Sequence, residues 1–159
     1  MKRSRMMSTL LLVAILAVGL VVGCQDSGPD DPRETVIALF GAMEKNDQAT
    51  VARLLDLPAL MRNTAEDYAV TTDQPRVFHS PHEILDDLTG DGLTKQRWFS
   101  LQRIINNAFV EGDAATVEVT FVDKEHSKGY RTNFGVHKLN GKWRIFSFKT
   151  FAEQPQSEN

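Results

Sequence analysis

The run Tyr130–Phe151, YRTNFGVHKLNGKWRIFSFKTF, decides the fold of this chain of 159 residues. Its centre is Asn140-Gly141, the dipeptide that most favours a two-residue β-hairpin turn because both residues tolerate positive φ. Apolar and polar residues alternate on either side of this dipeptide, as in half-buried strands. Tyr130 to Leu139 and Trp143 to Phe151 are therefore predicted to be neighbouring antiparallel strands.

A period of two also extends upstream of this hairpin. Ala115 to Val122 is predicted to be a strand with Val117, Val119 and Phe121 on one face. Trp98 to Val110 is predicted to be the strand before it. Polar, glycine-containing segments separate these runs, so consecutive strands should pair as a four-stranded antiparallel meander.

Helical signals fill the first half of the globular part. Asp31-Pro32-Arg33-Glu34 combines a capping residue, a proline at the first helical position and the glutamate of a capping box. Ser80-Pro81-His82-Glu83 repeats this pattern, and Gly90-Asp91-Gly92 ends the helix that follows. Two short helices are expected between these starts, one around Leu54 and one reaching towards Tyr68. The chain is thus predicted to be α+β, with N-terminal helices packed on a curved four-stranded antiparallel meander.

The start of the chain has the pattern of a secretory signal peptide. A basic segment, Met1 to Arg5, precedes the apolar run Leu10–Val22, which is shorter than the ~20 residues of a membrane-spanning helix. Val21-Val22-Gly23-Cys24 resembles the lipobox of bacterial lipoproteins. This resemblance implies cleavage between Gly23 and Cys24 and lipidation of Cys24, where two or more acyl chains give a stable anchor. The alternative is an ordinary buried cysteine.

These signals divide the chain into four parts: a signal peptide at 1–23, an acylated cysteine and flexible tether at 24–31, a domain at 32–152 and a polar tail at 153–159. In Gram-negative lipoproteins an aspartate directly after the cysteine favours the inner membrane. Gln25 stands at that position here. The resemblance therefore implies the bacterial envelope, with the periplasmic side of the outer membrane favoured over the inner membrane.

Charge and cysteine content exclude several classes of protein. The chain has 18 basic and 21 acidic residues, and the leader contains Lys2, Arg3 and Arg5, so the mature part has 15 basic residues and a formal charge of −6. An acidic domain argues against nucleic acid as a partner and against polybasic attachment to lipid. A single cysteine forms no internal disulfide and no cysteine-based zinc site.

A second resemblance concerns the globular part. The helix end Glu44-Lys45-Asn46-Asp47, the segment Leu54-Leu55-Asp56 and the hairpin run Gly141-Lys142-Trp143-Arg144-Ile145 are similar to the nuclear transport factor 2-like superfamily, including its small bacterial lipoproteins. The similarity spans about residues 32 to 151. It implies a cone-shaped domain with an apolar pocket at its open end. Members include isomerases, dehydratases, hydrolases and binding or dimerising modules, so the fold does not fix the function.

One polar face is the candidate site. Arg131, Asn133 and His137 share a face of the third strand, beside either the fourth or the first strand depending on the register. Together with Trp98 they are predicted to line a pocket for an anionic or polar ligand. The alternative, which we favour, is a half-exposed sheet face of the kind that every meander has.

Other titratable residues give weaker signals. Asp86 or Asp87 could supply an isomerase-type base, but beside Leu85 and Leu88 they are expected to be an exposed acidic pair. His79 and His82 flank Ser80-Pro81, and a surface position is favoured over a metal site because three convergent ligands are needed. The sequence indicates no catalytic set, metal or cofactor.

The sequence therefore predicts a lipid-anchored, non-enzymatic domain that binds a small ligand or a protein. The alternative is a small isomerase- or dehydratase-like enzyme acting on a hydrophobic substrate in the cone, which a pocket filled by Trp98, Phe109 and Phe121 would contradict. Expected partners are the membrane, reached through the N-terminal anchor, and either an envelope protein or a second copy bound to the outer sheet face.

Overall fold

The computed structural model describes residues 28–67 and 78–152. The predicted signal peptide, Cys24 and the rest of the tether up to residue 27, Tyr68 and the tail at 153–159 lie outside these ranges. None of the helices within them is long and apolar enough to cross a membrane.

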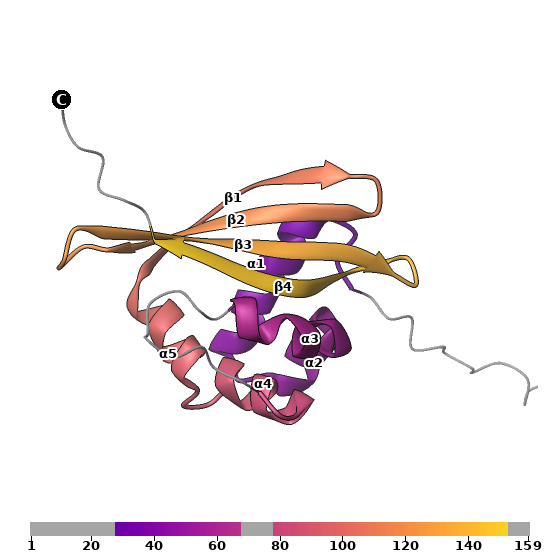
Figure 1. The fold of residues 1–159 in the computed structure, drawn as a ribbon, viewed down its shortest axis with the longest axis horizontal. Coiled ribbons are helices and arrows are strands. Elements are labelled where there is room, and N and C mark those ends of the chain that lie inside the picture. Colours follow the sequence, from indigo (N-terminus) through magenta and orange to yellow (C-terminus); the bar gives the residue numbers. More distant parts are fainter. Residues whose placement is uncertain (1–27, 68–77, 153–159) are drawn as a thin grey trace, which may run out of the picture.

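Residues 102–152 form one sheet of four antiparallel strands in the order β1-β2-β3-β4. The strands are β1 (Gln102–Glu111), β2 (Ala114–Asp123), β3 (Lys128–Leu139) and β4 (Lys142–Ala152), and Figure 1 shows each joined to the next by a hairpin. The turn between β3 and β4 has positive φ at both Asn140 and Gly141, of 53° and 78°. The predicted meander and its central turn are confirmed.

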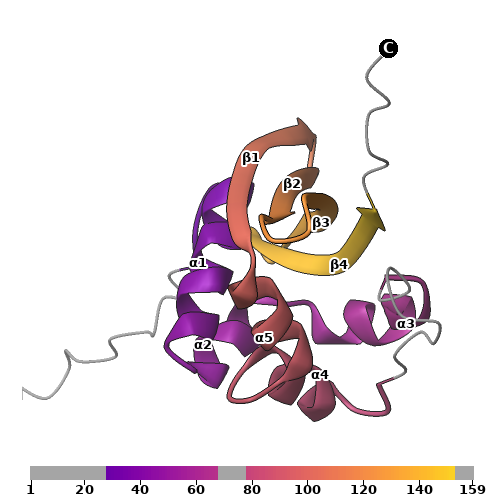
Figure 2. The same cartoon turned by 90° about the vertical axis from the view of Figure 1, so that its left-hand side faces the viewer.

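Helices of the described chain cover one face of this sheet, and the sheet curls around them (Figures 1 and 2). Two of the predicted caps are present, because the carboxylate of Asp31 accepts from the backbone N–H of Glu34 at 3.0 Å and the Ser80 hydroxyl accepts from that of Glu83 at 3.3 Å. The fold is an α+β cone. The helices are α1 (Pro32–Glu44), α2 (Gln48–Leu54), α3 (Leu57–Asp67), α4 (Pro81–Leu88) and α5 (Leu93–Ser100).

The prediction that Trp98 begins a strand is wrong, because Trp98 lies in α5. The helix begins after Gly92, which has no capping side chain, and a carboxylate from another helix takes that role. Oδ1 of Asp87 accepts from the backbone N–H of Thr94 at 3.3 Å. Gly92 permits this approach, since a β-carbon there would lie 2.2 Å from the Asp87 carbonyl oxygen. A contact from outside the segment thus starts α5, and strand-like alternation within 95–101 does not reveal it.

The core lies between the helices and the inner face of the sheet, which is the face turned towards the helices. Val117, Val119 and Phe121 of β2 point into it, as predicted, and are at most 1% exposed. The large, fully buried side chains come from all layers. They include Val36, Leu39 and Met43 of α1, Leu60 of α3, Ile84 and Leu88 of α4, Phe134 of β3, and Ile145 and Phe148 of β4.

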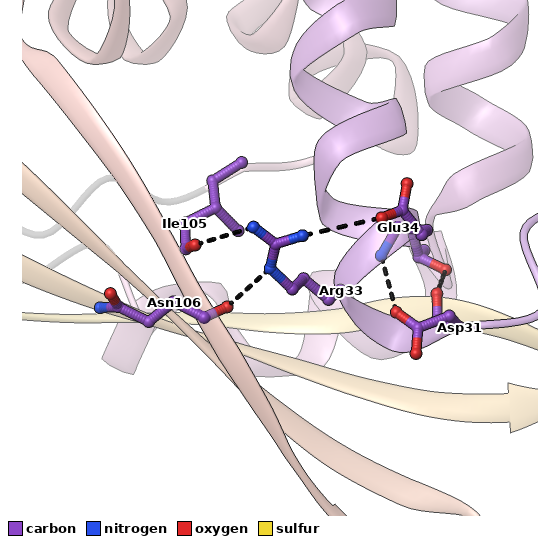
Figure 3. Close-up of polar contacts among 6 residues, drawn as sticks. Asp31, Arg33, Glu34, Ile105 and Asn106 are labelled. Carbon is purple, nitrogen blue, oxygen red and sulfur yellow. Dashed lines mark hydrogen bonds and ion pairs between the residues drawn. The ribbon is translucent and has the colours of Figure 1, made fainter.

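Arg33 fastens the first turn of α1 to an irregular point in β1. The register of β1 against β2 shifts between Ile105 and Ala108, which leaves carbonyl groups without regular ladder partners. Figure 3 shows the Arg33 guanidinium donating to the carbonyl oxygen of Asn106 at 3.2 Å and to that of Ile105 at 3.3 Å. The bulge is therefore held by a side chain that belongs to the helix layer.

Candidate functional site

Within the described residues, an aromatic cluster around Trp98 lies in the interior of the cone. This side chain is only 6% exposed. Its ring stacks on Phe121 at a centroid distance of 5.7 Å and an interplanar angle of 20°. Phe40, Phe134 and Phe148 surround it at 5.4 to 5.7 Å. Helix α5 thus inserts the indole into the interior of the cone.

Arg103 covers one edge of this cluster. Its guanidinium lies 4.0 Å from the ring centroid of Phe99 and 5.0 Å from that of Phe40. One guanidinium N–H donates to the carbonyl oxygen of Trp98 at 3.0 Å, which ties β1 to the end of α5. Burial lowers the pKa of Arg103, and the nearby charge of Glu44 opposes that shift. The charged group thus lies over two rings at the edge of the cluster.

Phe109 takes no part in filling the interior. It lies near the end of β1 and is 67% exposed. Its neighbour across the sheet is Thr116, on the face turned away from the helices. Two of the three aromatic residues named as the test of an enzyme pocket, Trp98 and Phe121, therefore fill the cone, and this weighs against a substrate site there.

Arg131, Asn133 and His137 lie on the outer face of the sheet, which is the face turned away from the helices. They alternate with Thr132, Phe134 and Val136, which are fully buried. The register places β3 between β2 and β4, so strand one is not their neighbour. The shared polar face is confirmed. The grouping with Trp98 is wrong, because the indole lies on the opposite face of the sheet.

A polar network joins three strands on this outer face. Glu118 of β2 accepts from the Arg131 guanidinium at 3.4 Å and from the Asn106 side-chain amide at 3.1 Å. The same amide donates to the Thr120 hydroxyl at 3.2 Å. Asn106 belongs to the bulge whose carbonyl oxygens Arg33 binds (Figure 3), so a side chain of the helix layer holds the backbone that carries this amide.

His137 forms the most buried polar contact of the candidate site. Its Nε2 lies 2.9 Å from Oδ2 of Asp56, and the two side chains are 32% and 12% exposed. The Phe146 ring lies against the imidazole at a centroid distance of 4.8 Å. Gly135 makes room for that ring, since a β-carbon there would lie 2.8 Å from the Phe146 Cζ.

Asp56 occupies the short link between α2 and α3, and three contacts fix it. Its backbone N–H donates to the Ile145 carbonyl oxygen at 2.8 Å, beside a bridge between Leu55 and Ile145 at the edge of β4. Its Oδ1 caps α3 by accepting from the backbone N–H of Ala59 at 3.1 Å. The second carboxylate oxygen is then directed at His137.

Sequence reasoning missed the role of Asp56. The spacing Asp56-Leu57-Pro58-Ala59 is a capping signal and predicts the Oδ1 contact. The Oδ2 contact joins residues 81 positions apart, so the local pattern contains no signal for it. Chemically, the carboxylate holds the imidazole in one orientation while Phe146 covers a ring face. The pair fastens the α2–α3 link to the outer face and leaves the imidazole in part open to solvent.

The expected exposed acidic pair is half wrong. Asp86 is exposed and accepts from the Gln48 side-chain amide at 3.0 Å. Asp87 is only 4% exposed, because it caps α5 and therefore faces inward. His82 lies 3.6 Å from Asp86, and His79 contacts Glu83 through its backbone N–H at 2.9 Å. Within residues 28–67 and 78–152, no group of three or more potential metal ligands converges.

A shallow hollow lies at the end of the sheet where β1 begins and β2 ends. Its volume is about 440 Å³. His126, in the adjoining turn, contacts the Asp123 carboxylate at 2.8 Å. This hydrogen bond, together with the backbone N–H of His126, lowers the pKa of Asp123. The hollow is lined by Ser100, Leu101, Gln102, Asp123, Lys124 and Glu125.

Comparison with solved structures gives matches to NTF2-like proteins, the class that the cone defines. An NTF2-like protein of unknown function from Methylobacillus flagellatus KT has a TM-score of 0.51 at 17% identity, covering 76% of this chain and 88% of that chain. One from Shewanella baltica OS155 has a TM-score of 0.49 at 15% identity, covering 77% of this chain and 90% of that chain. An NTF2-like protein with a cystatin-like fold from Novosphingobium aromaticivorans has a TM-score of 0.47 at 15% identity, covering 80% of this chain and 83% of that chain.

Neither a protein-family model nor a curated protein matches the sequence. At these identities the similarity shows the fold alone, an α+β NTF2-like cone, and the function has to be argued from the site.

Proposed function

We propose that this protein is a lipid-anchored, non-enzymatic domain of the bacterial envelope that binds a protein partner on the outer face of its sheet. The filled interior of the cone carries this proposal. An enzyme of the pocket type needs a cavity with a reactive group facing into it. Among the described residues, Trp98 and four phenylalanine rings occupy the interior of the cone.

The outer face supports the binding role. It presents hydrogen-bonding groups held by neighbours, such as the Asn106 amide and the Arg131 guanidinium, rather than loose side chains. An exposed apolar side chain, Ile104 at 48%, lies on the same face. Ordered polar groups beside apolar ones are typical of protein-binding surfaces.

Two features support anchoring. The lipobox-like run ends at Cys24, and the first helix begins eight positions later at Pro32. Replacing Cys24 with serine should leave the protein uncut or move it from the detergent-rich phase to the aqueous phase in a phase-separation assay. Unchanged partitioning of the Cys24→Ser protein would contradict lipidation.

Site-specific photo-crosslinking tests the binding role. A photoreactive side chain placed at Asn133, on the outer face, should capture one discrete envelope protein in cells. The matched control is the same group at Arg62, which is exposed on α3 in the helix layer. Capture of the same protein from both positions, or from neither, would contradict a partner that is specific for the outer face.

A further inference from the structure

The described chain begins against one end of the sheet. The backbone carbonyl oxygen of Asp30 accepts from the Trp143 indole N–H at 3.1 Å, and its carboxylate lies 2.8 Å from Lys142 Nζ. Gly28 packs beside Arg144, since a β-carbon on Gly28 would lie 3.0 Å from the Arg144 Nη1. These contacts hold the residues just before α1 at the start of β4.

The β1–β2 turn and the β3–β4 turn lie at this same end, on the right in Figure 1. The backbone N–H of Lys138, near the β3–β4 turn, donates to the Asp113 carbonyl oxygen in the β1–β2 turn at 2.8 Å. We call this part, residues 28–31, 109–114 and 138–143, the turn end of the domain. The β2–β3 turn lies at the opposite end of the sheet.

The turn end holds three of the five large apolar side chains that are exposed in the described chain. Phe109 and Val110, in the last three residues of β1, are 67% and 50% exposed, and Leu139, the last residue of β3, is 45% exposed. The other two are Leu93 in α5 and Ile104, which is near the start of β1.

We propose that the turn end rests on the surface of a lipid bilayer, with Phe109, Val110 and Leu139 in contact with its apolar boundary. This inference rests on the proposed lipidation of Cys24. Four residue steps separate Cys24 from Gly28, and an extended chain spans at most ~3.6 Å per step. The backbone of Gly28 therefore lies within ~14 Å of that of the acylated Cys24. In the proposed orientation, strands of ten residues such as β1 and β2 span ~33 Å and hold the opposite end of the sheet away from the lipid.

The charged residues of the turn end favour an apolar contact with the bilayer over an electrostatic one. Lys138 Nζ lies 3.5 Å from the Asp113 carboxylate, and Lys142 Nζ lies 2.8 Å from that of Asp30. Basic groups that already have acidic partners offer little attraction to anionic headgroups. Contact should therefore persist in vesicles of zwitterionic lipid and at high salt.

Fluorescence quenching in vesicles tests this orientation. The acylated full-length protein is reconstituted into phosphatidylcholine vesicles that contain a lipid with a nitroxide on its acyl chain. A thiol-reactive fluorophore is attached to a cysteine replacing Phe109, at the turn end. The control carries it on a cysteine replacing Lys124, which is exposed beside the β2–β3 turn. We expect several-fold stronger quenching at position 109 than at position 124.

The outcomes separate this inference from the proposed function. If the protein floats with the vesicles but both positions are quenched equally, the domain has no fixed orientation and the inference is overturned while anchoring stands. If the protein does not float with the vesicles, lipidation itself fails. The fluorophore at position 109 could instead become protected as the protein density in the vesicles rises, independently of the nitroxide content. That result would indicate a second copy on this surface and would also overturn the inference.

Substitution of the apolar side chains gives an independent check. Here the fluorophore is attached to a cysteine replacing Glu111, which is exposed and follows Val110. The triple variant Phe109→Ser, Val110→Ser, Leu139→Ser should lose most of the nitroxide quenching of this fluorophore. The matched control is Leu93→Ser, because Leu93 is 61% exposed but lies outside the turn end. Equal quenching in both variants would show that the apolar side chains do not contribute.

Discussion

The two faces of the sheet are built from alternate residues of the same strands, yet they differ in what holds their side chains. Along β3, Phe134 points into a cluster of aromatic rings, while Asn133 points to a half-exposed polar surface. The inner face is fixed by burial and the outer face by specific hydrogen bonds. The inner face therefore contributes most to the stability of the domain, and the outer face is where the proposed partner would bind.

The largest expected effect is on the inner face. Trp98→Ala should lower the free energy of unfolding by about 3–5 kcal/mol, because it removes the ring that contacts four phenylalanines and leaves a cavity. The matched change Phe109→Ala should stay within about 0.5 kcal/mol, because Phe109 is 67% exposed. Urea denaturation measures both. Similar losses for the two variants would remove the distinction between the faces.

Substitutions at two glycines test how α5 carries Trp98 into the interior. Gly92→Ala should cost about 1–3 kcal/mol, because the new β-carbon would meet the Asp87 carbonyl oxygen at 2.2 Å and displace the start of α5. Gly41→Ala should instead stabilise by about 0.5–1 kcal/mol, because Gly41 lies inside α1 with nothing within 4 Å of the added carbon. Thermal unfolding should show opposite signs, and the same sign for both would contradict this placement of α5.

A smaller effect on the free energy of unfolding is expected from the hydrogen bond that joins the outer face to the α2–α3 link. A double-mutant cycle of Asp56→Asn and His137→Ala should give a coupling of about 0.5–1.5 kcal/mol, because the two side chains are 2.9 Å apart and partly buried. Asp31→Asn combined with His137→Ala is the control and should show no coupling, since Asp31 caps α1 and does not contact His137. A coupling near zero in the first cycle would mean that the pair does not hold the α2–α3 link.

The smallest effect concerns the exposed pair Asp123 and His126. The pKa of Asp123 is held below its ordinary value of 3.8 by hydrogen bonds from His126. A lowered carboxyl pKa in the folded state favours folding above the ordinary value, and this contribution is lost as the pH falls through the folded value. His126→Ala should raise the Asp123 pKa towards 3.8, as measured by carboxyl carbon resonances in an acid titration. An unchanged pKa would show that the side-chain contact is absent in solution.

Local signals in the sequence are sufficient to predict most of the fold. Asn140-Gly141 fixes the last hairpin through its positive φ values, and Asp31 and Ser80 start their helices with side-chain caps. Alternation also places Arg131, Asn133 and His137 on one face. In each case the residues that determine the structure are close in sequence, so the pattern alone contains the information.

The features that sequence reasoning missed depend on residues distant in the chain. Helix α5 starts on the Asp87 carboxylate, and its strand-like pattern therefore gave the wrong element for Trp98. The Asp56–His137 contact spans 81 positions, so no local period predicts it. The lipobox prediction concerns Cys24, outside the described residues, and remains a prediction.

The occupancy of the cone interior is tested most directly by the fluorescence of Trp98. The chain has two tryptophans, so Trp143→Phe leaves Trp98 as the only indole. A steroid-sized apolar compound is titrated into this variant while its emission is recorded. A filled interior predicts blue-shifted emission that acrylamide quenches weakly and that the compound leaves unchanged. A saturable change in Trp98 emission with one equivalent of the compound would contradict the account, because it would show that the cone opens to a ligand.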